Sequence, residues 1–260
     1  MRSLSRLLSG GRRTEAPSRS VLILGMHRSG TSCLAGMLEH CGLHLGEVNR
    51  SSRHNPRGNH ESRVAMAIND DLLALAGGSW REPRDVGEVA PELAARIERY
   101  RRTMRATGQV WGIKDPRMLF CLGAWAEPTT ALVGTFRHPV AVARSLEARL
   151  QARKRPESVR VDWQALWFEY NARLVALYRR APFPVVDFDW EAERYLRVVG
   201  RVARWAALPG RGENFFDESL RHHRGAPAID EPRHRDLYAE LGEIAATEER
   251  KLAESFPASP

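Results

Sequence analysis

The stretch VLILGMHRSGTS, residues 21–32, decides the fold of this 260-residue chain. Its first four residues are all apolar, which is typical of a short strand buried on both faces of a parallel sheet. Gly25 ends this strand, and a helical pattern runs from residue 31 to residue 41. A strand, a glycine-containing loop and a helix in this order bring backbone N–H groups and a helix N-terminus to one anion. The stretch therefore predicts a phosphate-binding loop over residues 25–32.

The side chains of this loop indicate which phosphate it binds. Its glycine spacing, G-x-x-x-x-G, matches a Walker A loop, but Thr31 stands where Walker A has the lysine that reaches the β- and γ-phosphates. ATP or GTP hydrolysis is therefore disfavoured. Arg28 supplies one cation, and Thr31 and Ser32 supply two hydroxyls at the helix start. This set fits a 5′-phosphate that carries one further anionic group, while the alternative is a turn that binds nothing.

Further strands and helices alternate along the rest of the chain. Apolar runs at residues 110–113, 131–136 and 185–188 predict three more buried strands. Helical patterns lie between and after them, at residues 61–76, 91–107, 139–150, 162–180, 191–207 and 231–254. This alternation predicts an α/β fold of the P-loop type, with three α/β/α layers and a central, mostly parallel sheet. Residues 20–260 are expected to form a single domain with a helical C-terminal part.

Composition and charge restrict the class of protein. Forty basic and 32 acidic residues give a formal net charge of +8, which suggests an anionic partner such as nucleic acid, a lipid surface or a phosphorylated small molecule. Residues 1–19 are rich in Arg, Ser and Gly and predict a disordered basic tail, or alternatively a helix that contacts a membrane surface. The sequence lacks both an apolar signal-peptide core and a run of about 18 apolar residues, so a cytoplasmic location is expected.

A second anion site is predicted after the strand at residues 131–136. Arg137 follows this strand directly, and Ser145 lies eight residues later, about two turns into the next helix. Open α/β sheets bind their ligands at the carboxyl edge of the strands. A guanidinium at that edge and a nearby hydroxyl could share one phosphate.

These motifs together resemble a known family. Arg28-Ser29-Gly30-Thr31 after a first strand, with Arg137 and Ser145 after a later one, is similar to the two nucleotide motifs of the sulfotransferases that use 3′-phosphoadenosine 5′-phosphosulfate (PAPS). The sequence GIKDPR at residues 112–117 resembles the Lys-Asp-Pro segment of tyrosylprotein-type and many bacterial members. The resemblance covers roughly residues 20–225.

The resemblance implies PAPS as co-substrate and transfer of its sulfuryl group to a hydroxyl or amine of a small-molecule, glycan or peptide acceptor. It implies that Arg137 and Ser145 bind the 3′-phosphate of PAPS. It also implies that the 5′-phosphosulfate is held by Arg28, Ser29, Gly30, Thr31 and Ser32. Arg28 departs from the lysine of cytosolic members, although its planar fork still suits an anion. The histidine of their Lys-Thr-His segment is absent from Lys114-Asp115-Pro116, so the base must lie elsewhere.

Candidate catalytic residues follow from the needs of sulfuryl transfer, which resembles phosphoryl transfer and requires cations and a base. Lys114 is the expected partner of the transferring group, with Arg28 as the cation of the loop. Glu47 is the first choice for the base, because a glutamate just after the first helix has this role in tyrosylprotein-type and some bacterial members. Weaker choices are Glu61, Asp115 and His60. No metal is expected, since the histidines and three cysteines show no metal-ligand spacing.

Three points stay open. The run RHHR at residues 221–224 is either a basic loop that closes over the 3′-phosphate, with Arg224 as a ligand, or a solvated charge run. A P-loop kinase with a degenerate lysine is a second reading, which would depend on ATP and magnesium. A basic nucleic-acid-binding protein is a third, but the arginines are spread over predicted helices without a nucleic-acid-binding motif. No nucleic-acid partner is therefore expected.

Overall fold

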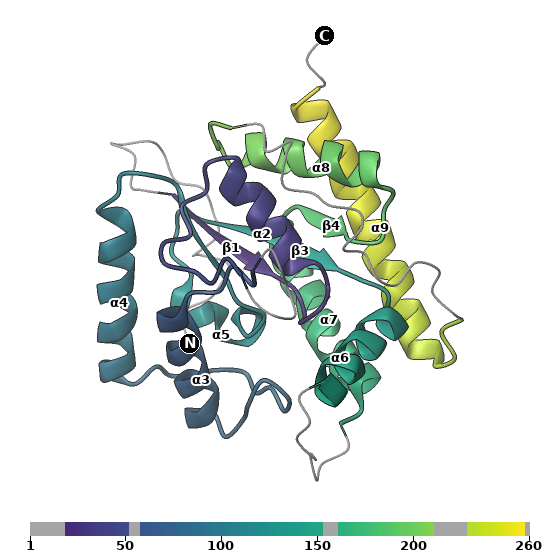
Figure 1. Cartoon of the computed structure of the whole chain (residues 1–260), viewed down its shortest axis with the longest axis horizontal. Coiled ribbons are helices and arrows are strands. Elements are labelled where there is room, and N and C mark those ends of the chain that lie inside the picture. Colours follow the sequence, from purple (N-terminus) through teal and green to yellow (C-terminus); the bar gives the residue numbers. More distant parts are fainter. Residues whose placement is uncertain (1–18, 52–57, 153–160, 211–227, 258–260) are drawn as a thin grey trace.

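The computed structural model describes residues 19–51, 58–152, 161–210 and 228–257 (Figure 1). The predicted basic tail, apart from residue 19, and the run at residues 221–224 with Arg224 lie outside the described residues. Within the described ranges, no helix has both the length and the apolar composition that a membrane crossing requires.

The centre of the fold is a parallel sheet, as the sequence predicts. In spatial order its strands are β2 (Trp111–Lys114), β1 (Ser20–Leu24), β3 (Thr130–Phe136) and β4 (Val185–Asp187). The register places Ile23 beside Lys114 on one side and beside Val133 on the other. Because all four strands run in one direction, their carboxyl ends meet at the same edge of the sheet. The residues that follow these strands carry the chemistry described below.

Helices surround this sheet, and Figure 1 shows α3 and α4 on the opposite side of the molecule from α9. The described helices are α2 (Thr31–His40), α3 (Arg63–Leu75), α4 (Pro91–Arg105), α5 (Met118–Trp125), α6 (Pro139–Ala152), α7 (Trp163–Arg180), α8 (Ala192–Trp205) and α9 (Pro232–Ser255). The helices predicted from periodicity are all present, with ends that differ by one or two residues.

Alternation along β1 divides the core into two layers. Val21 and Ile23 face a cluster formed with α2 and α8, which includes Leu38 and Val202. Leu22 and Leu24 face the larger cluster, which α3, α4, α5 and α7 complete. Helix α9 lies against β4 and contacts both α7 and α8, so it closes the edge of the sheet (Figure 1). The three-layer α/β/α prediction is confirmed.

The structure corrects two helical predictions. The first is α5, which sequence periodicity misses because its residues MLFCLGAW are apolar on nearly every side and six of the eight are buried. The second concerns the start of α3, which begins at Arg63 after an N-cap at Ser62, whose hydroxyl accepts a hydrogen bond from the Ala65 N–H. Glu61 therefore precedes the helix instead of lying in its first turn, and belongs to the loop that reaches Lys114.

Candidate active site

The phosphate loop is fixed onto β3 by close backbone contacts. Gly25 has φ 152°, and a Cβ at this position would lie 2.4 Å from the Thr135 carbonyl oxygen. The Thr135 hydroxyl in turn donates to the Ser29 carbonyl at 3.1 Å. Arg28 and Gly30 both have left-handed backbones, with φ 66° and 81°. Such conformations curl the chain so that successive N–H groups point to one side, as anion binding requires.

Gly30 also makes room for a second strand end. A Cβ on Gly30 would lie 2.1 Å from the ring of Phe188, which follows β4. The loop therefore packs between the ends of β3 and β4, and a side chain at residue 30 would force them apart. The buried Ser29 hydroxyl has no hydrogen-bond partner within the described part of the chain.

Arg28 and Ser145 are 117 residues apart in sequence and meet in the structure. The Arg28 Nε donates to the Ser145 hydroxyl oxygen at 2.7 Å. Burial lowers the pKa of Arg28, and the charges of Arg149 and Arg137 lower it further. The guanidinium groups of Arg149 and Arg137 thus lie close enough to repel that of Arg28, and an anion bound by Arg28 would relieve this repulsion.

Asp189 holds Arg137 in place. The Arg137 Nε donates to one carboxylate oxygen of Asp189 at 3.1 Å, and the His138 N–H donates to the other at 2.8 Å. The Arg137 guanidinium also lies over the Phe188 ring, 5.2 Å from its centroid. These contacts fix the cation at the carboxyl edge of the sheet, where the sequence places it.

Lys114 ends β2 and is almost fully enclosed, with its side chain 3% exposed. Its ammonium donates to Glu61 Oε1 at 2.6 Å, to the Asn59 carbonyl at 3.0 Å and to the Ser32 hydroxyl at 3.2 Å. A lysine has three N–H donors, so these contacts use all of them. Lys114 thereby joins the phosphate loop to the segment of residues 59–61.

The ion pair governs the acidity of Glu61. Burial raises the pKa of Glu61, but the charge of Lys114, the interaction with His27, the hydrogen bond from Lys114 and the charge of Arg117 outweigh burial and hold the pKa below its ordinary value. The carboxylate is therefore ionised and close to the phosphate loop. If Lys114 turned to another anion, burial would dominate and Glu61 would become a stronger base.

The segment that carries Glu61 is anchored on α2. His60 has a left-handed backbone, φ 51°, and its Nδ1 lies 2.9 Å from Glu39 Oε2. Arg50 donates to the other oxygen of Glu39 at 2.5 Å, and the His60 N–H donates to the Asn49 carbonyl at 3.0 Å. His60 is buried, so its imidazole supports the loop.

Asp115 follows Lys114 and braces the next turn. One of its carboxylate oxygens accepts from the Arg117 N–H at 3.0 Å and from Arg117 Nη1 at 2.9 Å, and the other accepts from the Asn69 amide at 3.0 Å. Burial raises the pKa of Asp115 although the charge of Arg117 opposes it. Both oxygens are thus occupied by neighbouring donors.

Glu47 lies apart from the pair of Lys114 and Glu61. Its side chain is exposed, and it makes no hydrogen bond or ion pair to another described residue. The structure brings the second candidate for the base, Glu61, to Lys114. In the described ranges, no group of three or more His, Cys, Asp or Glu side chains is arranged to hold a metal ion.

Sequence reasoning misses four residues of this site. Arg149 lies one helical turn after Ser145, which is a signal that helical spacing could have given. Asp189 comes two residues after β4, at the same sheet edge as Arg137. Asn59 contributes only its carbonyl, so no side-chain pattern marks it. His27 lies inside the phosphate loop itself, but the pattern that identifies such a loop consists of glycines, a cation and hydroxyls and does not include a histidine.

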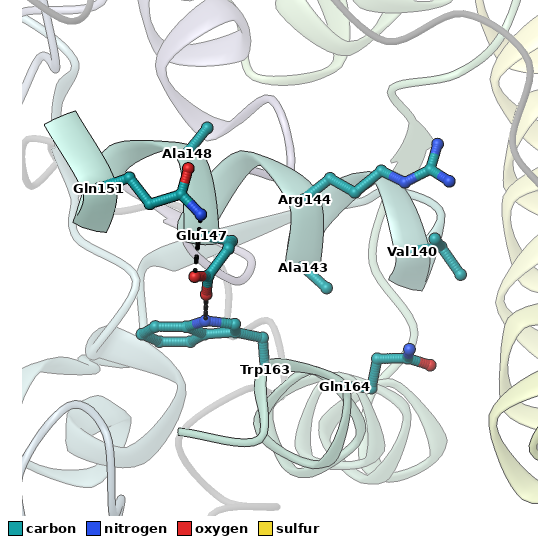
Figure 2. A pocket seen from close by; sticks show the side chains of 8 residues that line it. All are labelled: Val140, Ala143, Arg144, Glu147, Ala148, Gln151, Trp163 and Gln164. Atoms are coloured by element: carbon teal, nitrogen blue, oxygen red, sulfur yellow. Dashed lines mark hydrogen bonds between the residues drawn. The ribbon is translucent and has the colours of Figure 1, made fainter. Parts of the chain in front are cut away.

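A shallow groove of about 400 Å³ lies between α6 and α7 (Figure 2). On its floor, Glu147 accepts from the Trp163 indole N–H at 3.0 Å and from the Gln151 amide at 3.3 Å. Arg144 and Gln164 also line it, whereas Ser145, Arg28 and Lys114 do not. The groove is therefore distinct from the cluster of cations.

Comparison with known proteins finds similarity at the level of structure. A sulfotransferase domain from a curacin biosynthetic pathway superposes with a TM-score of 0.51 and 14% identity, over 88% of this chain and 99% of that one. A sulfotransferase domain from the Synechococcus PCC 7002 olefin synthase gives a TM-score of 0.44 and 16% identity, over 97% of this chain and 100% of that one. The curacin-pathway likeness supports the P-loop-type α/β/α fold. No protein-family model and no curated protein sequence matches the chain.

Proposed function

We propose that this protein is a sulfotransferase that moves a sulfuryl group from PAPS to a hydroxyl or amine of a small-molecule, glycan or peptide acceptor. The observation that carries the proposal is the contact of Arg28 with Ser145 at 2.7 Å, together with the charges of Arg149 and Arg137 that act on Arg28. A loop suited to a 5′-phosphate and a site suited to a second phosphate thus adjoin, as a 3′,5′-bisphosphate demands.

The donor would occupy both parts of this edge. Backbone N–H groups of residues 28 and 30–32, the helix α2 N-terminus and the buried Ser29 hydroxyl are available to the 5′-phosphosulfate, whereas the Ser29 N–H donates to the Met26 carbonyl at 3.2 Å. Arg137, Ser145 and Arg149 would bind the 3′-phosphate, with Asp189 orienting Arg137. Thr31 in place of the Walker lysine, and the second cationic site, favour this donor over ATP.

The chemical step transfers one group and one proton. The acceptor oxygen attacks sulfur, a new S–O bond forms, and the bond between sulfur and the bridging oxygen of the 5′-phosphate breaks. The electron pair of that bond leaves with 3′-phosphoadenosine 5′-phosphate (PAP), and the acceptor proton passes to the Glu61 carboxylate. Lys114 neutralises the charge that develops on the leaving phosphate, an effect worth about 3 kcal/mol for one preorganised donor.

The contacts of Lys114 support Glu61 as the base, ahead of Glu47. Lys114 has no N–H to spare, because Ser32, Asn59 and Glu61 accept all three. If PAPS binds at Ser32 and accepts a hydrogen bond from Lys114, Lys114 must therefore release at least one of these three acceptors. Withdrawal from Glu61 leaves that carboxylate buried without its main counter-ion, which raises its proton affinity as the reaction needs.

Ligand-dependent thermal unfolding tests the proposal. We expect PAP at about a hundred times its Kd to add about 2.7 kcal/mol and to raise Tm by roughly 5–10 °C. ADP, and ATP with magnesium, serve as comparisons. Arg137→Ala should reduce the shift with PAP. Arg179→Ala, which removes an ion pair between Arg179 on α7 and Glu240 on α9, should not. The proposal would be overturned if only ATP with magnesium raised Tm, or if none of the nucleotides did.

A further inference from the structure

His27 occupies the phosphate loop between Met26 and Arg28, and neither its sequence position nor the proposed function gives it a role. Its Nε2 atom is buried and has no hydrogen-bond partner among the described residues. An imidazole nitrogen enclosed without a partner destabilises the fold, because it loses its hydrogen bond to water and gains none in return. Such a group beside a binding loop indicates a partner that arrives with the ligand.

The ring is held firmly by aromatic neighbours. The indole of Trp80 lies 4.8 Å from it, centroid to centroid, and the ring of Tyr170 lies 6.0 Å from it in an edge contact. The Tyr170 hydroxyl donates to the Trp80 carbonyl at 2.8 Å, so both neighbours belong to one unit. Trp80 is only half-buried, so this side of the unit reaches the surface.

Charges of both signs act on His27. Of these charges, the Glu61 carboxylate has the largest effect on the ring, and the cations Arg117, Lys114 and Arg149 act against it. Burial lowers the pKa of His27 from 6.5 to about 3, and the three cations lower it further, although Glu61 opposes them. The imidazole is therefore neutral near pH 7 and offers one N–H donor close to three cations that would attract an anion.

We propose that His27 binds the sulfonate of the donor, with its Nε2–H donating to an oxygen of the group that is transferred. This inference rests on the proposed function, and it assigns the sulfonate oxyanion to a residue that directly precedes Arg28. The bond would not form with PAP, which has no sulfonate. His27 would thus distinguish PAPS, which carries the sulfonate, from the product PAP.

The test compares the Kd of PAPS with that of PAP, measured by calorimetry for the whole chain. His27→Phe keeps an aromatic ring against Trp80 and Tyr170 but removes both nitrogens. We expect it to raise the Kd of PAPS by about 10- to 100-fold, the range for one hydrogen bond to a charged group. The Kd of PAP should change by less than about twofold, because His27 makes no contact with PAP in this proposal and such substitutions have small effects.

His234→Phe is the matched control. Like His27, His234 on α9 has a buried ring nitrogen without a partner among the described residues, and its ring packs against Trp167 and Phe168. This variant should leave the ratio of the two Kd values unchanged. His27→Leu provides the same comparison where the Phe variant does not fold. Equal weakening of PAPS and PAP, or unchanged PAPS binding, would overturn the role of His27. Failure of the wild-type protein to bind PAP would instead overturn the proposed function.

Discussion

At the scale of single residues, the ammonium of Lys114 links the phosphate loop to Glu61, the proposed base. It is 3% exposed and divides its three N–H donors among the phosphate loop, the Asn59 carbonyl and the Glu61 carboxylate. A group with no spare donor cannot bind a new anion without releasing an old acceptor. Occupation of the loop and the protonation of Glu61 are therefore coupled.

This coupling predicts uptake of a proton when PAP binds. As Lys114 moves from Glu61 to the 5′-phosphate, the pKa of the Glu61 carboxylate rises, so that a fraction of one proton is taken up when PAP binds. Calorimetry in buffers of different ionisation enthalpy measures this uptake. Glu61→Gln should take up less than the wild type, and Glu47→Gln, which changes an exposed carboxylate, should match the wild type. Identical uptake in all three proteins would contradict the coupling.

Much of the residue-level site follows from the sequence, namely the cation and hydroxyls of the loop, Arg137, Ser145 and Lys114. Each of these lies at a strand end or at a fixed helical offset, so local pattern places it. The contact of Lys114 with Glu61 does not follow, because it depends on how the loop before α3 folds back over β2. The contact of Asp189 with Arg137 cannot be predicted for the same reason, since only the pairing of β3 with β4 brings these two residues together.

At the scale of elements, the sheet was predictable because parallel strands with both faces covered appear as continuous apolar runs. The alternation of these runs with amphipathic periods was enough for the layer architecture. Helix α5 could not be predicted in this way, because a helix buried on nearly every side has no polar face that would reveal its helical period. The start of α3 was misplaced by two residues, which moved Glu61 from a helix into a loop.

The fit of the phosphate loop between strand ends yields a prediction for Gly30→Ala. Its left-handed φ of 81° and the 2.1 Å approach of Phe188 leave no space for a methyl group. We expect the free energy of unfolding to fall by about 2–3 kcal/mol, from strain and overpacking together. Urea denaturation measures the change.

Gly200→Ala is the control for this substitution, because Gly200 lies within α8 and a Cβ there meets nothing within 4 Å. Alanine favours a helix over glycine, so this variant should gain about 0.5–1 kcal/mol. If Gly30→Ala were as stable as the wild type, the loop would have to sit farther from β4 than the structure places it.

At the scale of the whole molecule, the neutral burial of His27 makes stability depend on pH. The pKa of His27 is about 3 in the folded protein, because of burial, against 6.5 for an exposed imidazole. Between pH 3 and pH 6.5, His27 is therefore protonated in the unfolded chain and neutral in the folded protein. The free energy of unfolding is therefore unaffected by His27 above pH 6.5. It falls as the pH is lowered from 6.5 toward 3, by up to about 1.4 kcal/mol per pH unit.

Urea unfolding of the wild type and of His27→Phe at pH 7 and pH 5 measures this effect of His27. The wild type should lose more stability between the two pH values than the variant. The other buried histidines with a lowered pKa, His138 and His234, are present in both proteins and cancel in the difference. Parallel pH profiles would show that the imidazole is charged, or solvated, in the folded state.

The order of strands in the sheet also bears on how the chain is made. β1 is one of the two inner strands, yet its neighbours β2 and β3 are complete only at Lys114 and Phe136. A ribosome adds about 5–20 residues per second, so the apolar run of β1 leaves the exit tunnel roughly 5–20 s before its first partner strand exists. The period in which this protein is most open to aggregation therefore falls early in synthesis.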